Sequence, residues 1–146
     1  MLRVVSDCPG ESRTPDLISL SANFSRELDP LEFKVLQDLL GESLSAIPLT
    51  PLKYFAGEFA GSGALRLALL LLSIRDQVIP PTINPKELLP GSSWDRRFIP
   101  FRSGRVESCL MTGFTFGGGN ACVAIQSSSL EGVGKPIAAD LQVGHF

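Results

Sequence analysis

The chain has 146 residues, of which 44% are hydrophobic and 19% are charged, and its formal net charge at pH 7 is -2. A hydrophobic fraction of this size excludes a disordered chain and can build the core of one ordinary domain. The nearly balanced charge, without a basic cluster, argues against a nucleic-acid partner.

The first half of the chain predicts two short strands with a helix between them. Residues 17–21 form a mainly apolar run typical of a strand. Asp29 and Pro30 then predict the start of a helix, since Asp is a good N-cap and Pro suits the first helical position. Leucine and valine side chains follow at helical spacing until Gly41, which ends the helix. Residues 47–50 are a second strand candidate.

The second half predicts one buried helix followed by strands. Residues 59–77 are apolar on nearly all sides, so we expect a helix that is covered on several sides. Residues 78–95 are rich in proline and irregular, and residues 127–146 form a flexible tail. Glycine turns separate three predicted strands, at residues 96–101, 106–116 and 121–126. This order predicts an α/β domain over residues 1–126, with a layered mixed sheet and a buried helix.

Cysteine use and hydropathy favour a cytoplasmic protein without a membrane span. The most apolar stretch, residues 67–74, is far shorter than the roughly 20 residues that a membrane-spanning helix needs. The first residues reach Asp7 without the long apolar run of a signal peptide. Cys8, Cys109 and Cys122 are widely spaced and form no CxxC motif. This spacing argues against a disulfide framework and a structural metal site, and it favours reduced thiols.

Three motifs follow one another along the chain: KYFAGEFAGSG at residues 53–63, PPTIN at residues 80–84 and GFTFGGGN at residues 113–120. In this combination they resemble the C-terminal half of a β-ketoacyl-acyl-carrier-protein synthase, over roughly residues 17 to 126. The resemblance implies a thiolase-like C-terminal half that is incomplete relative to the family. It also implies a role in fatty acid or polyketide synthesis, without a cofactor or a metal.

The resemblance places the family's catalytic positions on residues of different chemistry. Lys53 falls on the catalytic Lys, whereas Ser21 and Glu58 replace the two catalytic His residues. In the family these imidazoles donate hydrogen bonds to the thioester oxygen as it becomes an enolate. A serine is a weaker donor, and an ionised glutamate cannot donate and repels the enolate. Since the loss of one such donor costs about 2.7–4 kcal/mol, we expect catalysis to be lost.

Lys53 therefore has two interpretations, a retained catalytic Lys or a buried cation in an ion pair. Because both His positions have changed, the ion pair is favoured, and its candidate partners are Glu58, Asp29 and Glu32. Asp29 and Glu32 fall on acidic positions of the family. Leu67 replaces an acidic residue that the family carries on its long buried helix.

The glycine-rich run after Phe116 also has two interpretations. Phe116 falls on the family's gate residue, with Gly117 and Gly118 beside it, so the resemblance implies a place at the substrate tunnel. As a phosphate loop the run lacks the Lys-Ser/Thr pair of a P-loop and a helix that follows. Glycines that serve a tight turn, with Phe116 as core filler, are the alternative interpretation.

These observations favour a degenerate ketosynthase-like subunit or fragment that has no catalytic activity of its own. It would resemble chain-length factors, which pair with an active ketosynthase, and acyl carrier protein is a further candidate partner. Because the chain starts near the middle of the family's fold and omits the Cys-bearing half, we expect a truncated or split gene. Two alternatives stay open. One is an acyltransferase that condenses acyl and malonyl thioesters in a split or heteromeric ketosynthase, and the other is a thiolase-like binding module.

Overall fold

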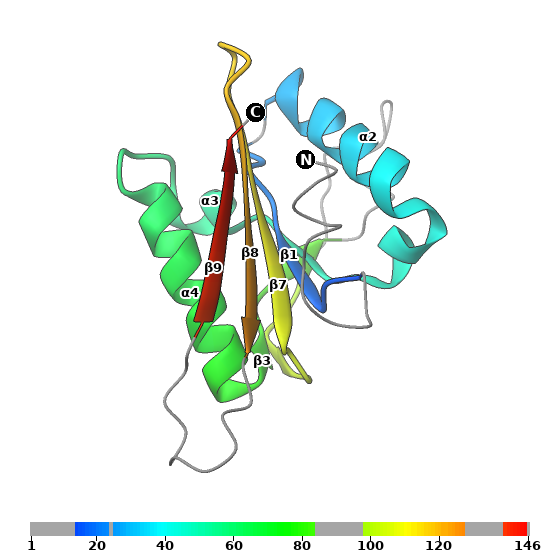
Figure 1. The fold of residues 1–146 in the computed structure, drawn as a ribbon, viewed down its shortest axis with the longest axis vertical. Coiled ribbons are helices and arrows are strands. Elements are labelled where there is room, and N and C mark those ends of the chain that lie inside the picture. Colours follow the sequence, from blue (N-terminus) through cyan, green and yellow to red (C-terminus); the bar gives the residue numbers. More distant parts are fainter. Residues whose placement is uncertain (1–13, 24, 84–97, 128–138, 146) are drawn as a thin grey trace.

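The protein folds around a mixed β-sheet in the computed structural model, which describes residues 14–23, 25–83, 98–127 and 139–145, with residues 98 and 139–145 described through their backbone (Figure 1). Its elements are β1 (Leu17–Ser19), α2 (Leu28–Leu40), the 3-10 helix η1 (Gly41–Ala46), β2 (Leu49–Thr50), α3 (Leu52–Ala56), α4 (Ser62–Asp76), β3 (Val78–Ile79), β4 (Thr82–Ile83), β5 (Phe98–Ile99), β6 (Arg102–Ser103), β7 (Ser108–Phe114), β8 (Asn120–Ser127) and β9 (Ala139–His145). The main sheet has seven strands in the order β5-β4-β2-β1-β7-β8-β9, and β3 pairs with β6 in a second sheet.

The central strand, β1, lies parallel to both of its neighbours. Ile18 faces Leu49 of β2 on one side and Leu110 of β7 on the other. The remaining pairs of the main sheet are antiparallel. The carboxyl ends of β1, β2 and β7 therefore meet at the same edge, which is where α/β sheets commonly place their sites. The predicted α/β class with a layered mixed sheet is confirmed.

The two faces of the sheet carry separate hydrophobic cores. One core contains Ile18 of β1 and Leu36 of α2. The other contains Leu17 of β1 and Leu70 of α4. Neighbouring residues of β1 serve different cores because successive side chains of a strand point to opposite faces. As a result α2 and α4 cover opposite sides of the sheet (Figure 1).

The helix α2 is confirmed, but its start differs from the predicted one. It begins at Leu28, so Asp29 lies inside the first turn and not at the N-cap. Asp29 is buried, and its carboxylate accepts hydrogen bonds from the Asn23 N–H (3.2 Å) and the Tyr54 hydroxyl (2.7 Å). A tertiary contact thus replaces the expected capping role. At the other end Gly41 is confirmed as the terminating residue, with a φ of +56° that favours glycine.

The helix α4 is confirmed within the predicted range, and the short helix α3 before it was not predicted. The inner side of α4, with Leu70 and Ile74, is buried against the sheet. Its outer side differs from the prediction, because Leu65 is 37% exposed and Leu72 is 40% exposed. The prediction that this helix is covered on several sides was wrong, because among the described residues the sheet buries only its inner side.

The C-terminal segment also differs from the predicted flexible tail. Residues 139–145 form β9, which pairs with β8 in an antiparallel register from Ala121↔His145 to Ser127↔Ala139. The physical reason is an alternation of apolar and polar residues in this segment, Asp140-Leu141-Gln142-Val143, which has the period of a strand. Residues 128–138 lie outside the described residues, as do residues 84–97, which include most of the proline-rich segment and the first two residues of the strand predicted at 96–101.

The other expected strands are confirmed as β5, β7 and β8, the first over two residues only. In the ranges that the structure covers, no helix combines the length and the apolar character needed to cross a bilayer.

Candidate functional site

The positions that the motifs align with the family's catalytic residues are linked to one another at the carboxyl end of β1. Ser21 follows β1, and its Oγ accepts a hydrogen bond from the Phe114 N–H at the end of β7 (3.1 Å). The side-chain amide of nearby Asn23 donates to the Glu58 carboxylate. Glu58 in turn pairs with Lys53 on α3. Three segments far apart in the sequence, the ends of β1, α3 and β7, therefore build one site.

Ser21 is held on both its backbone and its side chain. Its N–H donates to Glu32 Oε1 (2.7 Å), and its hydroxyl both accepts from the Phe114 N–H and lies 3.5 Å from the Phe114 carbonyl oxygen. The residue is buried. The hydroxyl that would have to replace an imidazole donor is thus engaged with the backbone of β7.

Lys53 and Glu58 form the ion pair that the sequence favoured. Lys53 Nζ lies 2.8 Å from Glu58 Oε1. The hydrogen bond from Lys53, followed by the one from Asn23, lowers the pKa of Glu58 below its ordinary value. At neutral pH Glu58 is therefore ionised and only accepts hydrogen bonds. Of the three candidate partners of Lys53, Glu58 is the one that the structure brings to it, while Asp29 contacts Tyr54 and Glu32 contacts Ser21.

A buried polar layer lies beneath this site and was missed in the sequence. Arg66 of α4 is only 4% exposed. Its Nη2 donates to the carbonyl oxygens of Ser19 and Thr112 (2.7 Å each), and its Nε donates to Ser19 Oγ (3.1 Å). The Thr112 hydroxyl also donates to Glu32 Oε1, the same oxygen that accepts from the Ser21 N–H. The layer thus ties α2, α4, β1 and β7 together.

Burial acts on both charged members of this layer. It raises the pKa of Glu32, against the hydrogen bonds from Thr112 and Ser21 and the positive charge of Arg66. It lowers the pKa of Arg66 to about 10, against the negative charges of Glu32 and Glu58. A charge pair in a desolvated setting is costly unless its polar atoms are bonded, which is the case here. The signal in the sequence was a lone arginine in an otherwise apolar helix segment, residues 62–74.

Phe116 lies apart from these contacts, in the turn between β7 and β8. It is 73% exposed, so the interpretation as core filler is wrong. Gly118 has a φ of +78°, and its N–H donates to the Thr115 carbonyl oxygen (3.1 Å), as a tight turn requires. The turn role is thereby confirmed for Gly118. The gate role of Phe116, Gly117 and Gly118 stays a prediction.

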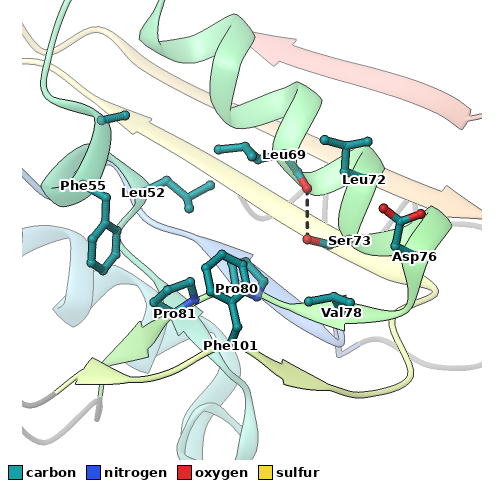
Figure 2. Close-up of a pocket in the computed structure, with 11 residues that line it drawn as sticks. Leu52, Phe55, Leu69, Leu72, Ser73, Asp76, Val78, Pro80, Pro81 and Phe101 are labelled. Carbon is teal, nitrogen blue, oxygen red and sulfur yellow. Dashed lines mark hydrogen bonds between the residues drawn. The ribbon is translucent and has the colours of Figure 1, made fainter.

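An apolar groove of about 400 Å³ lies between α3, α4 and the Pro80-Pro81 segment (Figure 2). In this view Leu69 and Leu72 of α4 lie above the groove, Phe55 of α3 lies to its left and Phe101 lies below it. Its remaining lining residues are Leu52, Ala56, Ser73, Asp76, Val78, Pro80 and Pro81. Within the described ranges, no group of three or more His, Cys, Asp or Glu side chains is arranged to hold a metal ion.

Comparison with known proteins gives a consistent set of matches. The family model for the β-ketoacyl synthase C-terminal domain matches residues 2–86. The tetracenomycin polyketide synthase ketoacyl synthase beta subunit of Streptomyces glaucescens is 33% identical over 112 residues, which is 76% of this chain and 27% of that protein. The alpha subunit of the same synthase is 33% identical over 69% of this chain and 24% of its own length.

A 3-oxoacyl-[acyl-carrier-protein] synthase 2 of Coxiella burnetii is similar as well, 28% identical over 75% of this chain and 27% of its own length. The chain thus spans about a quarter of the length of the curated relatives it matches.

Proposed function

Because the chain belongs to the β-ketoacyl synthase family, we propose that it acts as a degenerate, non-catalytic ketosynthase-like subunit in fatty acid or polyketide synthesis. Its partner is an active ketosynthase chain, as for the chain-length factors that its motifs resemble. The observation that carries the proposal is the 2.8 Å ion pair between Lys53 and Glu58, at the position of a family His.

The chemistry of the site supports the loss of catalysis. A decarboxylating condensation needs hydrogen-bond donors aimed at the oxygen on which negative charge develops. Glu58 is an acceptor, and its carboxylate neutralises Lys53, the cation beside it. The Ser21 hydroxyl is engaged with Phe114 of β7. None of these three positions offers a free neutral donor to an enolate.

The names of two relatives support a ketosynthase-like partner, since they are the alpha and beta subunits of one synthase. We extend the proposal to transient contact with acyl carrier protein, which delivers acyl groups to synthases of the resembled family. The thiols of Cys109 and Cys122 are buried and belong to no disulfide among the described residues, which fits a reducing, cytoplasmic setting.

The test is co-expression of this chain with the tetracenomycin ketoacyl synthase alpha subunit. Co-purification and the release of labelled CO₂ from a malonyl carrier are measured, with this chain alone as reference. We expect a stable complex and no decarboxylation by this chain alone. Lys53→Ala should leave the decarboxylation rate unchanged, as should Lys34→Ala, a matched control on the exposed side of α2.

A double variant tests whether the residues at the two His positions cause the loss of decarboxylation. Ser21→His combined with Glu58→His should bring decarboxylation above the background of the unaltered complex. If the unaltered chain decarboxylates the substrate and Lys53→Ala, but not Lys34→Ala, lowers the rate tenfold, the chain is an acyltransferase of a split ketosynthase. The absence of any complex would point to the binding-module alternative.

A further inference from the structure

The main sheet ends in two edges of different character. One edge is β5, which has only two residues and is followed directly by Pro100, a residue without an N–H to donate. The other edge is β9, with seven residues that include no proline, lysine or arginine. Proteins protect open strand edges with short strands, prolines and charged side chains. β5 is protected in two of these ways, whereas β9 has a single charged residue, Asp140, near its start.

β9 pairs with β8 along its whole length and presents its other edge to the outside of the sheet. The register runs without a bulge from Ala121↔His145 to Ser127↔Ala139. β9 is the last strand in the sheet order, so among the described residues no strand pairs with its outer edge (Figure 1). A long strand edge without a partner is a template for another strand.

The hydrogen bonds of β8 indicate which backbone groups of β9 point outward. The Ser127 N–H donates to a backbone carbonyl oxygen next to β7 (2.7 Å), so Ser127 points toward β7. The hydrogen-bonding groups of successive residues alternate between the two edges of a strand. Ala124 therefore points toward β9, where it pairs with Gln142. Gln142 thus bonds with β8, while its neighbours Leu141 and Val143 present their N–H and C=O groups to the open edge.

We propose that the open edge of β9 binds the same edge of a second copy of this chain, in an antiparallel pair centred on Gln142. In this register Leu141 stands opposite Val143 of the second copy, and every outward N–H meets an outward C=O. All seven residues of β9 are paired, which no other register of two identical β9 strands achieves. Each copy has one such edge, so the contact closes after two copies.

The sequence of β9 is compatible with pairing to itself. Apolar Leu141 and Val143 meet each other, and Asp140 stands opposite Gly144, so the two carboxylates do not oppose each other. β9 also lies outside residues 2–86, which the family model matches. The proposal therefore goes beyond the proposed function and does not depend on it.

The experiment measures the mass of the full chain, without any other protein, by sedimentation equilibrium over a range of concentrations. We expect a dimer in equilibrium with its monomer. Val143→Pro removes an outward N–H and leaves the hydrogen bonds between β9 and β8 in place. Since each copy then loses a hydrogen bond across the contact, the dissociation constant should rise about tenfold or more.

A charge swap at Gln142 tests the register. Gln142 stands opposite Gln142 of the second copy, so Gln142→Lys places like charges opposite each other and should weaken the dimer about fivefold. Gln142→Glu should do the same, and an equal mixture of the two variants should form a heterodimer at least as stable as the unaltered dimer. Gln37→Lys and Gln37→Glu, on the exposed side of α2, are the matched controls and should leave the dissociation constant unchanged.

Other results would overturn the proposal. A chain that stays monomeric over the whole concentration range forms no such contact. A dimer that neither Val143→Pro nor the charge swap weakens is built by another surface. Two charge variants that stay monomeric when mixed would reject the register centred on Gln142. If circular dichroism shows that Val143→Pro is unfolded, the charge swap decides alone, because it keeps every backbone N–H.

Discussion

Removing the buried cation of Arg66 should destabilise the protein strongly, and the structure allows the magnitude to be worked out. Arg66→Met keeps much of the side-chain volume but deletes the bonds to Ser19 Oγ, Ser19 O and Thr112 O. Each of these buried oxygens loses a charged donor, and a buried acceptor that loses its partner costs about 1–3 kcal/mol. Glu32 also loses the positive charge that lowers its pKa against the effect of burial. Removal of one partner from a buried charged network costs about 3–5 kcal/mol, and we expect that loss of unfolding free energy.

The assay is a urea titration read by pulse proteolysis, with three variants and one control. Glu32→Gln alone and the double variant test coupling. If the two side chains belong to one network, the double variant should lose about 1–3 kcal/mol less than the sum of the single losses. Arg75→Met is the control, because Arg75 lies on the same helix but in an exposed pair with Asp76. Exposed pairs of this kind contribute little, so Arg75→Met should leave the urea midpoint nearly unchanged. An equal, small loss for Arg66→Met and Arg75→Met would refute the reasoning.

Three further outcomes follow from single residues. Burial raises the pKa of Glu32 above 4.5, so the contribution of this group to stability is present below that pH and is lost as the pH rises through the folded-state pKa. Glu32→Gln should flatten this decline when urea midpoints are measured against pH, and an unchanged slope would contradict the prediction. Burial raises the pKa of the Cys109 thiol to about 12, so iodoacetamide should modify Cys109 only as the chain unfolds in urea. Labelling is followed by mass spectrometry, and rapid labelling of the native protein would contradict this prediction. Gly118→Ala should lower stability by about 1 kcal/mol because of its positive φ, whereas Gly117→Ala, which meets open space, should leave the melting temperature unchanged; equal effects would remove the turn argument.

Much of the fold could be predicted because local patterns determine it. The strand around Ile18 and the helix ended by Gly41 were visible as an apolar run and as a helical repeat with a stop. The pair of Lys53 and Glu58 was predicted from chemistry, since Glu58 places a negative charge at a family His position, five residues after the retained Lys53. These features depend on residues that are near one another in the chain.

What was missed depends on distant residues. Arg66 stands in an apolar helix, and its acceptors on Ser19 and Thr112 lie 47 and 46 residues away. No local pattern shows which strand ends will meet it. The partly exposed Leu72 was missed for a related reason, because composition predicts that an apolar helix will be covered but does not say by what. The buried Asp29 was assigned to a cap because capping is the local role of that residue type.

The position of β1 between β2 and β7 has a consequence for the order in which the protein folds during synthesis. Asp16, next to β1, bonds with Ser108, the first residue of β7, across 92 residues of sequence. The edge of β1 that pairs with β7 therefore stays unpaired until most of the chain has left the ribosome. Folds dominated by such distant pairings form slowly, and their open strand edges favour aggregation meanwhile. The yield of native protein therefore depends on how soon β7 reaches β1, and not on the final stability of the sheet alone.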